Sequence, residues 1–216
     1  MKGIVEKPLM DWNQHLASVD WFRSAGCVAG AYLIGCFTTG YYLVRWQTGQ
    51  DIRGVGSGST GARNVGRILG KPGFLLTVFG DLAKGAVAVW LARFLAHDEF
   101  FAALAVPAVV AGHLWPAQLR FHGGKGIATS FSALLVFDFR LALTQLALFG
   151  ILFAIARRTL LPAMFSFVCL PAICWFFVRD NVTIAVITAL SAAILFAHRR
   201  NLSEEFSALK SEQPKL

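Results

Sequence analysis

The chain has 216 residues, of which 56% are hydrophobic and 15% are charged, and its mean hydropathy is +0.59. A soluble domain of this length cannot bury so much apolar surface, so the composition excludes an ordinary soluble enzyme and indicates an integral membrane protein. The net charge of +8 does not indicate a nucleic acid partner, because the basic residues lie between hydrophobic stretches and form no single polar patch.

Hydrophobic stretches recur along nearly the whole chain, and a helix needs about 20 residues to cross the hydrocarbon. We expect an all-α, polytopic helix bundle with about seven transmembrane helices. We place them at 24–44, 72–95, 100–119, 127–139, 141–156, 160–178 and 182–197. Residues 127–156 hold two spans only if each is short or tilted, and a re-entrant hairpin is the alternative.

The spans divide the chain into three parts. These are an N-terminal extension at 1–23, which lacks the apolar core of a cleavable signal, a membrane domain at 24–205 and a C-terminal tail at 206–216. Thirteen Lys and Arg residues fall on the side of the C-terminus and six on the side of the N-terminus. Since cytoplasmic loops carry the excess, the count predicts an external N-terminus and a cytoplasmic C-terminus.

The first unusual polar segment, at 54–67, combines glycines, hydroxyls and two arginines. Glycine lets backbone N–H groups approach an anion, and arginine supplies paired donors for phosphate oxygens. The segment lacks the Gly-Lys-Ser/Thr ending of a P-loop, and it follows a membrane span instead of a soluble strand. It predicts a phosphate-binding loop, with a flexible linker as the alternative. The residues of interest are Gly56, Ser57, Gly58, Gly61, Asn64 and Arg67.

The second polar segment, at 111–129, follows the third predicted span. Pro116 should end the helix and leave His113 near a water-facing mouth, although an interfacial histidine without function is equally compatible. The run Gly123, Gly124, Lys125 and Gly126 offers backbone donors around one cation just before a helix N-terminus, where anions are favoured. This run is a second predicted phosphate site.

The third segment, at 196–202, closes the last span. His198 and Asn201 are three residues apart and share a helical face, whereas Arg199 and Arg200 are explained equally well as anchors among lipid headgroups. Within the second span Asp81 and Lys84 also share a face. Such an intramembrane pair marks either a substrate pocket or a structural contact.

Taken in order, GSGSTGARNVGR at 56–67, DLAKG at 81–85, GHLWP and FHGGKGIATS at 112–130 and HRRNL at 198–202 resemble the acyl-phosphate-dependent glycerol-3-phosphate acyltransferases of bacteria. The resemblance implies seven spans with an external N-terminus in the bacterial inner membrane. It also implies transfer of a fatty acyl group from acyl phosphate to the 1-hydroxyl of glycerol 3-phosphate, with lysophosphatidic acid and inorganic phosphate as products. No metal or other cofactor is implied.

The same resemblance implies the roles of site residues. Ser57, Lys125, His198 and Asn201 are expected to take part in catalysis. Substrate binding is expected at Gly56, Ser57, Gly58, Gly61, Asn64, Arg67, Lys84, His113, Gly123, Gly124, Lys125 and Gly126. Either His198 or a phosphate oxygen of the substrate takes the hydroxyl proton, and a serine acyl-enzyme at Ser57 is the least favoured route.

The first loop departs from the family pattern at three positions. Ser59, Thr60 and Arg63 stand where Asn, Pro and Thr are expected, so a stiffening proline is lost and a charge is gained. We expect the anion-binding loop to survive, with altered acceptor affinity or identity. The alternatives are a paralogue with another phosphorylated acceptor, a transporter of anions or phosphate esters, and a membrane scaffold with basic loops.

Overall fold

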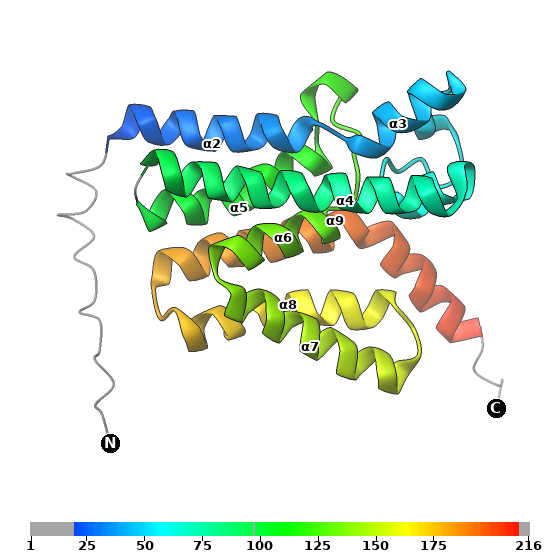
Figure 1. The fold of residues 1–216 in the computed structure, drawn as a ribbon. Helices are drawn as coiled ribbons and strands as arrows, with labels where there is room; N and C mark the ends of the chain where they lie inside the picture. The colour runs from blue at the N-terminus through cyan, green and yellow to red at the C-terminus, as the bar shows by residue number, and fades with distance from the viewer. Residues whose placement is uncertain (1–19, 97, 212–216) are drawn as a thin grey trace.

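The computed structural model describes residues 20–96 and 98–211, so most of the extension predicted at 1–23 and the last residues of the tail lie outside the described part. Within that part every regular element is a helix (Figure 1), as the composition predicts. In chain order they are α2 (Trp21–Cys36), α3 (Thr39–Thr48), η1 (Ile52–Gly54), α4 (Ala62–Ala96), α5 (Glu99–Leu114), η2 (Ala117–Leu119), α6 (Ile127–Phe137), α7 (Phe139–Ala156), α8 (Leu160–Phe177) and α9 (Asn181–Ser211).

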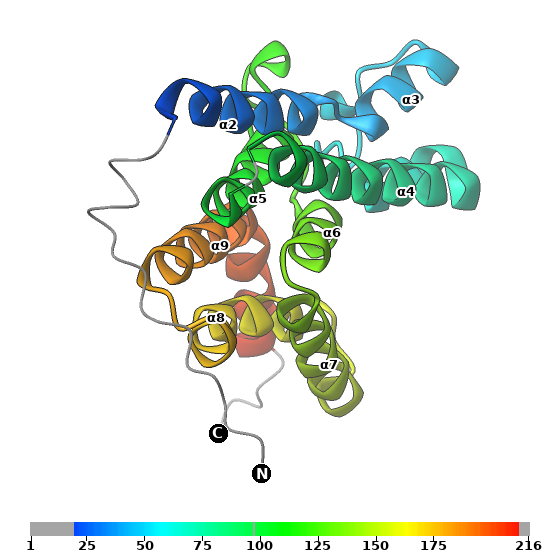
Figure 2. The ribbon, with the colours of Figure 1, turned by 60° about the vertical axis from the view of Figure 1, so that its left-hand side comes forward.

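The helices stack in layers (Figure 1, Figure 2), with α2 and α3 over α4 and α5, then α6 and α9, and finally α7 and α8. The central helix is α5, which packs against α2, α4, α6 and α9 and buries most of its side chains. Backbones approach closely where it crosses α2. A Cβ atom on Gly35 would lie 2.1 Å from the carbonyl oxygen of Val109, and one on Gly112 would lie 2.1 Å from that of Tyr32. Small residues at such crossings let membrane helices pack tightly.

Six segments of the described chain are long and apolar enough to cross a membrane. The seventh apolar helix, α6, has only 11 residues, which gives it a length of about 16 Å against about 30 Å of hydrocarbon. The following helix, α7, has 18 residues. Of the two spans predicted in 127–156, the first is therefore short and the second is of full length.

The short helix α6 lies along the second half of α4. A Cβ atom on Gly85, near the middle of α4, would lie 2.4 Å from the carbonyl oxygen of Thr129 in the first turn of α6. At the other end, Arg93 donates hydrogen bonds to the carbonyl oxygens of Val136 and Phe137. The loop before α6 is thereby brought to the middle of α4.

Several helix boundaries differ from the predicted spans. The third span, predicted to end at 119, ends as a helix at Leu114. The first span, predicted as one helix, is interrupted at Phe37 and Thr38, between α2 and α3. The second begins ten residues earlier than predicted, at Ala62, and is broken at Gly70, whose φ is 68° and which precedes Pro72. The last helix continues to Ser211, since residues 202–211 include Leu, Glu, Ala and Lys, which are good helix formers and carry the helix past the apolar stretch.

Candidate active site

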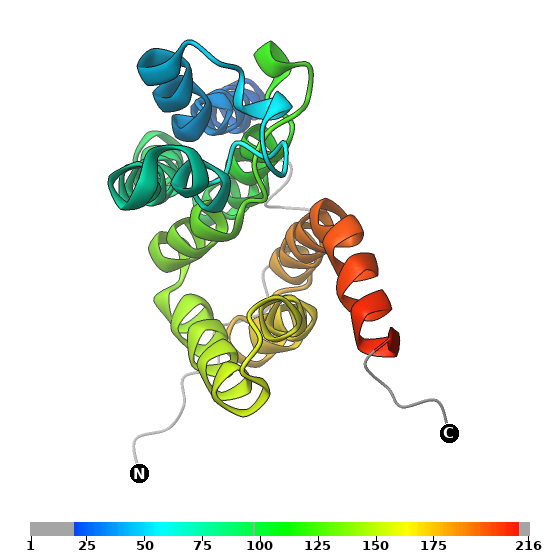
Figure 3. The same cartoon turned by 90° about the vertical axis from the view of Figure 1, so that its right-hand side faces the viewer.

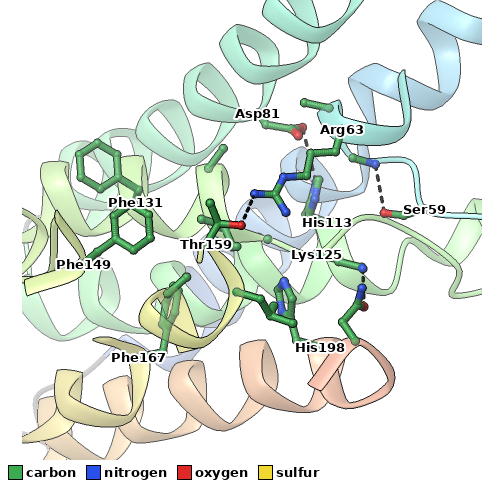
Figure 4. A pocket seen from close by; sticks show the side chains of 18 of the residues that line it. Ser59, Arg63, Asp81, His113, Lys125, Phe131, Phe149, Thr159, Phe167 and His198 are labelled. Atoms are coloured by element: carbon green, nitrogen blue, oxygen red, sulfur yellow. Dashed lines mark hydrogen bonds and ion pairs between the residues drawn. The ribbon is translucent and has the colours of Figure 1, made fainter. Parts of the chain in front are cut away.

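A cavity of about 510 Å³ lies among α4, α6, α7, α8 and α9. Its polar end is lined by side chains from all three predicted polar segments, and its apolar end is lined by α6, α7 and α8 (Figure 4). The polar lining includes Ser57, Ser59, Arg63, Asn64, Arg67, His113, Lys125, His198 and Asn201. The apolar lining includes Ile127, Phe131, Leu146, Phe149, Leu160, Ala163 and Phe167. One cavity therefore offers both a place for an anion and a place for a hydrocarbon chain.

The first polar loop is organised by the buried side chain of Asn64. Its Oδ1 accepts a hydrogen bond from the backbone N–H of Ser57 (3.1 Å), and its Nδ2 donates to the carbonyl oxygens of Val55 (2.8 Å) and Ser59 (3.0 Å). The loop is tight, because Gly56 and Gly58 have φ of 61° and 69°, a region that favours glycine. Asn64 thus acts from the first turn of α4 to fix the shape of the loop that carries Ser57.

The second polar loop folds around His113 at the end of α5. The backbone N–H groups of Gly123 and Gly124 donate to the carbonyl oxygens of Leu114 and His113. The imidazole packs so closely that a Cβ atom on Gly124 would lie 2.1 Å from its Nε2. The loops also meet each other, since the N–H of Thr60 donates to the carbonyl oxygen of Gly123 (3.4 Å).

Beside His113 lies a buried group of charges, of which the carboxylate of Asp81 also lines the cavity. Lys84 Nζ contacts Asp81 Oδ1 at 2.9 Å and His113 Nδ1 at 2.5 Å, and it donates to the carbonyl oxygen of Phe37 at 3.0 Å. That carbonyl belongs to the break between α2 and α3, where it has no helical partner. Lys84 therefore joins α4 to α5 and to the helix break.

Lys125 and His198 approach the cavity from the loop before α6 and from α9. Lys125 Nζ donates to Asn201 Oδ1 at 2.5 Å, which ties the loop to α9. The Nδ1 of His198 lies 2.9 Å from the carbonyl oxygen of Ile194. Because a carbonyl oxygen only accepts, Nδ1 carries the proton, and Nε2 of the neutral ring is left as a proton acceptor.

Three cations of this site have no acidic partner. Among the described residues, no carboxylate lies within ion-pair distance of Arg63, Arg67 or Lys125. Burial lowers the pKa of Lys125 from its usual value, as does repulsion from Arg63 and Arg67, while attraction to Glu204 raises it. Unpaired cations that repel one another form a site that is stabilised when an anion binds.

The structure brings most of the predicted site residues to this cavity. Those that line it are Ser57, Gly61, Asn64, Arg67, His113, Lys125, Gly126, His198 and Asn201. Gly56, Gly58, Gly123 and Gly124 shape the two loops from behind the lining, and Lys84 lies in the buried charge group instead of in the wall.

Sequence reasoning missed the apolar half of the cavity and the partner of Arg63. Arg63 Nη2 donates to Thr159 Oγ1 at 3.0 Å, so the first turn of α4 contacts the start of α8 across the mouth of the cavity. In the sequence, the one feature that pointed to this contact was Arg63 itself, which stands where the family pattern has Thr. Phe131, Phe149 and Phe167 carried no signal, because aromatic residues in apolar helices look the same whether they face lipid, core or cavity.

Comparison with known proteins agrees with this geometry. The model of the family described as glycerol-3-phosphate acyltransferase matches residues 25–208. Glycerol-3-phosphate acyltransferase 1 of Desulfitobacterium hafniense is 41% identical over 177 residues, covering 82% of this chain and 88% of the relative. The glycerol-3-phosphate acyltransferase of Clostridioides difficile is 40% identical over 177 residues, which cover 80% of this chain and 86% of that relative.

A solved structure is also similar. It is the crystal structure of PlsY, an integral membrane glycerol 3-phosphate acyltransferase, in its glycerol 3-phosphate form. It superposes with a TM-score of 0.77 at 27% identity, covering 86% of this chain and 92% of the other. This multi-pass membrane protein therefore belongs to the glycerol-3-phosphate acyltransferase family.

Proposed function

We propose that this chain transfers a fatty acyl group from acyl phosphate to the 1-hydroxyl of glycerol 3-phosphate, giving lysophosphatidic acid and inorganic phosphate. The observation that carries the proposal is the cavity itself, which joins an unpaired cationic end to an apolar end lined by α6, α7 and α8. An acyl phosphate has the same two parts. Two solved structures of the relative PlsY support this reading, because one is a glycerol 3-phosphate form and the other a lysophosphatidic acid form.

The reaction needs positioning and charge stabilisation more than covalent help from the protein. Acyl phosphate is a mixed anhydride, so phosphate is already a good leaving group. The acceptor hydroxyl oxygen bonds to the carbonyl carbon, the bond from that carbon to the phosphate oxygen breaks, and phosphate departs. Arg67, Lys125 and the loop N–H groups would hold phosphate oxygens, while Ser57 and Asn201 would orient them by hydrogen bonds.

The hydroxyl proton has two possible acceptors in this scheme. Nε2 of His198 is unprotonated in the tautomer that Ile194 selects and lines the same cavity. A phosphate oxygen of the substrate is the other acceptor. A His198→Gln variant separates the two routes, because glutamine keeps a hydrogen-bonding group but cannot take the proton at neutral pH. Loss of kcat with little change in KM identifies His198 as the base.

The decisive test uses purified protein in detergent or lipid. Inorganic phosphate release from palmitoyl phosphate is followed with and without glycerol 3-phosphate, beside an Arg67→Ala variant. We expect release that depends on the acceptor, and we expect the variant to lose it. Folded wild-type protein that releases no phosphate with this substrate pair contradicts the proposal.

We place the protein in the bacterial inner membrane with its C-terminus in the cytoplasm. The supporting observation is that the loop before α4 and the second half of α9, which both contribute polar lining to the cavity, lie at the same end of the bundle (Figure 1, Figure 3). The excess of Lys and Arg predicts that end to be cytoplasmic. The orientation can be tested by fusing to the C-terminus a reporter enzyme that works only outside the cytoplasm. Activity of this reporter contradicts the proposed orientation.

A further inference from the structure

Arg63 lies at the junction of two cavities. Beside the cavity already described is a second one of about 520 Å³, at the start of α8 and the second half of α9. Its lining is mainly charged or polar and comprises Arg63, Arg157, Arg158, Thr159, Leu160, Asn201, Glu204, Glu205 and Ala208. Arg63, Thr159, Leu160 and Asn201 line both cavities, so the second one leads to the polar end of the first.

The guanidinium of Arg63 is exposed and only weakly engaged. Its Nη2 donates to the neutral hydroxyl of Thr159, and a guanidinium has five N–H donors. Glu205, in the same cavity, pairs with Arg158 at 3.1 Å and not with Arg63. Since no described carboxylate lies within ion-pair distance of Arg63, its charge is available to a ligand.

Two bound phosphates carry more negative charge than two cations neutralise. A monosubstituted phosphate carries a charge of about −1.5 to −2 near neutral pH, and the proposed function brings two of them, glycerol 3-phosphate and acyl phosphate, into one cavity. Arg67 and Lys125 supply two positive charges. Arg63 lines the same cavity and is close enough to Lys125 to lower its pKa, so it lies within electrostatic reach of a bound phosphate.

We infer that Arg63 is a binding residue for the phosphate of the water-soluble acceptor, and that the second cavity is the route by which this phosphate ester enters. The inference rests on the proposed function. The second cavity offers only Leu160 and Ala208 as apolar lining, which suits a small hydrophilic ester and gives no surface for an acyl chain. In the structure the Thr159 hydroxyl accepts a hydrogen bond from the guanidinium, and a phosphate dianion would displace the hydroxyl because a charged, bidentate contact is stronger than a neutral one.

The test measures KM for glycerol 3-phosphate and for palmitoyl phosphate separately in four variants. Arg63→Ala removes the cation, and Arg63→Lys keeps the charge without the planar fork. Thr159→Val removes only the hydroxyl that accepts the hydrogen bond from Arg63. Arg199→Ala is the matched control, because Arg199 is another exposed arginine, stacked on Phe196 at 4.0 Å and outside both cavities.

We expect Arg63→Ala to raise KM for glycerol 3-phosphate about tenfold or more, the effect of losing a hydrogen bond to a charged group. KM for palmitoyl phosphate should change little, and inorganic phosphate should inhibit the variant less strongly in competition with the acceptor. Arg63→Lys should fall between wild type and Arg63→Ala. Thr159→Val should lower KM for the acceptor slightly, because it frees the guanidinium, and Arg199→Ala should resemble wild type.

Three outcomes overturn the inference. A rise in KM for palmitoyl phosphate alone assigns Arg63 to the donor. A Thr159→Val variant that is impaired in the same way as Arg63→Ala makes the pair a structural contact. Unchanged kinetics in Arg63→Ala remove the residue from the site. Because all of these require an active wild type, they are distinct from a failure of the proposed function itself.

Discussion

The Nζ atom of Lys84 in α4 lies 2.5 Å from Nδ1 of His113 in α5. An ammonium group only donates, so Nδ1 is the acceptor and the proton of the neutral ring is on Nε2. That nitrogen faces the backbone of Gly124, next to Lys125. The lysine thus fixes the imidazole, and the imidazole fixes the loop, which explains how a residue outside the cavity lining contributes to the site.

Replacing Lys84 by Met should destabilise the protein more than it weakens substrate binding. The variant leaves the buried carboxylate of Asp81 without its cation, and breaking a buried ion pair costs about 3–5 kcal/mol. Thermal unfolding in detergent should show a lower midpoint, part of which Asp81→Asn restores in the double variant. If Lys84 instead binds substrate directly, KM rises while the unfolding midpoint is unchanged.

Replacing Gly124 by Ala should abolish activity. The added Cβ atom would lie 2.1 Å from Nε2 of His113, so the loop that carries Lys125 must move. Gly150→Ala in α7 is the matched control, because nothing lies within 4 Å of the added atom, and alanine in a helix interior stabilises by about 0.5–1 kcal/mol. Removing the imidazole in a His113→Ala/Gly124→Ala double variant relieves the clash and should restore some phosphate release. Equal activity in both single alanine variants contradicts the close packing.

The activity should have an alkaline limit set by Lys125. Burial and the neighbouring Arg63 and Arg67 lower the pKa of this lysine, so its charge is lost at a lower pH than that of an ordinary lysine. As pH rises through that pKa, the positive charge disappears and KM for the phosphate substrates should rise. Lys125→Arg should flatten this limb, because arginine does not titrate in the range. Arg63→Ala should move it to higher pH, and a limb unaffected by either change contradicts the assignment.

A bulky residue at Ala163 should shorten the acyl chain that the enzyme accepts. Ala163 lines the apolar part of the cavity, near Phe167 of the same helix. A phenyl ring there occupies space that the distal carbons need, at a cost of about 1–3 kcal/mol, or about 5- to 150-fold in KM. Ala163→Phe should therefore lose palmitoyl phosphate and keep octanoyl phosphate, measured as phosphate release over a series of chain lengths. A uniform loss across the series argues for misfolding and against a chain-length effect.

The helical membrane fold could be predicted from the sequence, because apolar length alone distinguishes a membrane helix from other structures. Pro116 correctly marks the end of α5, since its ring cannot continue a helix. The break at Phe37 and Thr38 could not be predicted. It depends on Lys84, 47 positions further along the chain, which donates a hydrogen bond to the carbonyl oxygen of Phe37 that the break leaves free.

The polar half of the site could be predicted because glycines, arginines and histidines are unusual in a membrane chain and point to phosphate chemistry. Which of them touch the cavity depends on packing. Asn64 organises its loop through three hydrogen bonds that no spacing rule reveals. Lys84 and Asp81 share a face as predicted, but only the structure shows that the lysine turns toward His113.

The shortness of α6 has an energetic consequence for how a lipid and a water-soluble molecule meet. Moving a chain of sixteen carbons from hydrocarbon into water costs about 0.8 kcal/mol for each CH₂ group, or about 12 kcal/mol in all. The short α6 begins beside Gly85 of α4, and Lys125 just before it is half-buried and lines the cavity whose other end is apolar. The acyl chain can then remain among other hydrocarbon chains throughout the turnover, while the hydrophilic partner descends to it through a charged passage. Under the proposed function the enzyme would therefore bring its hydrophilic substrate to the lipid, and no lipid would have to leave the bilayer.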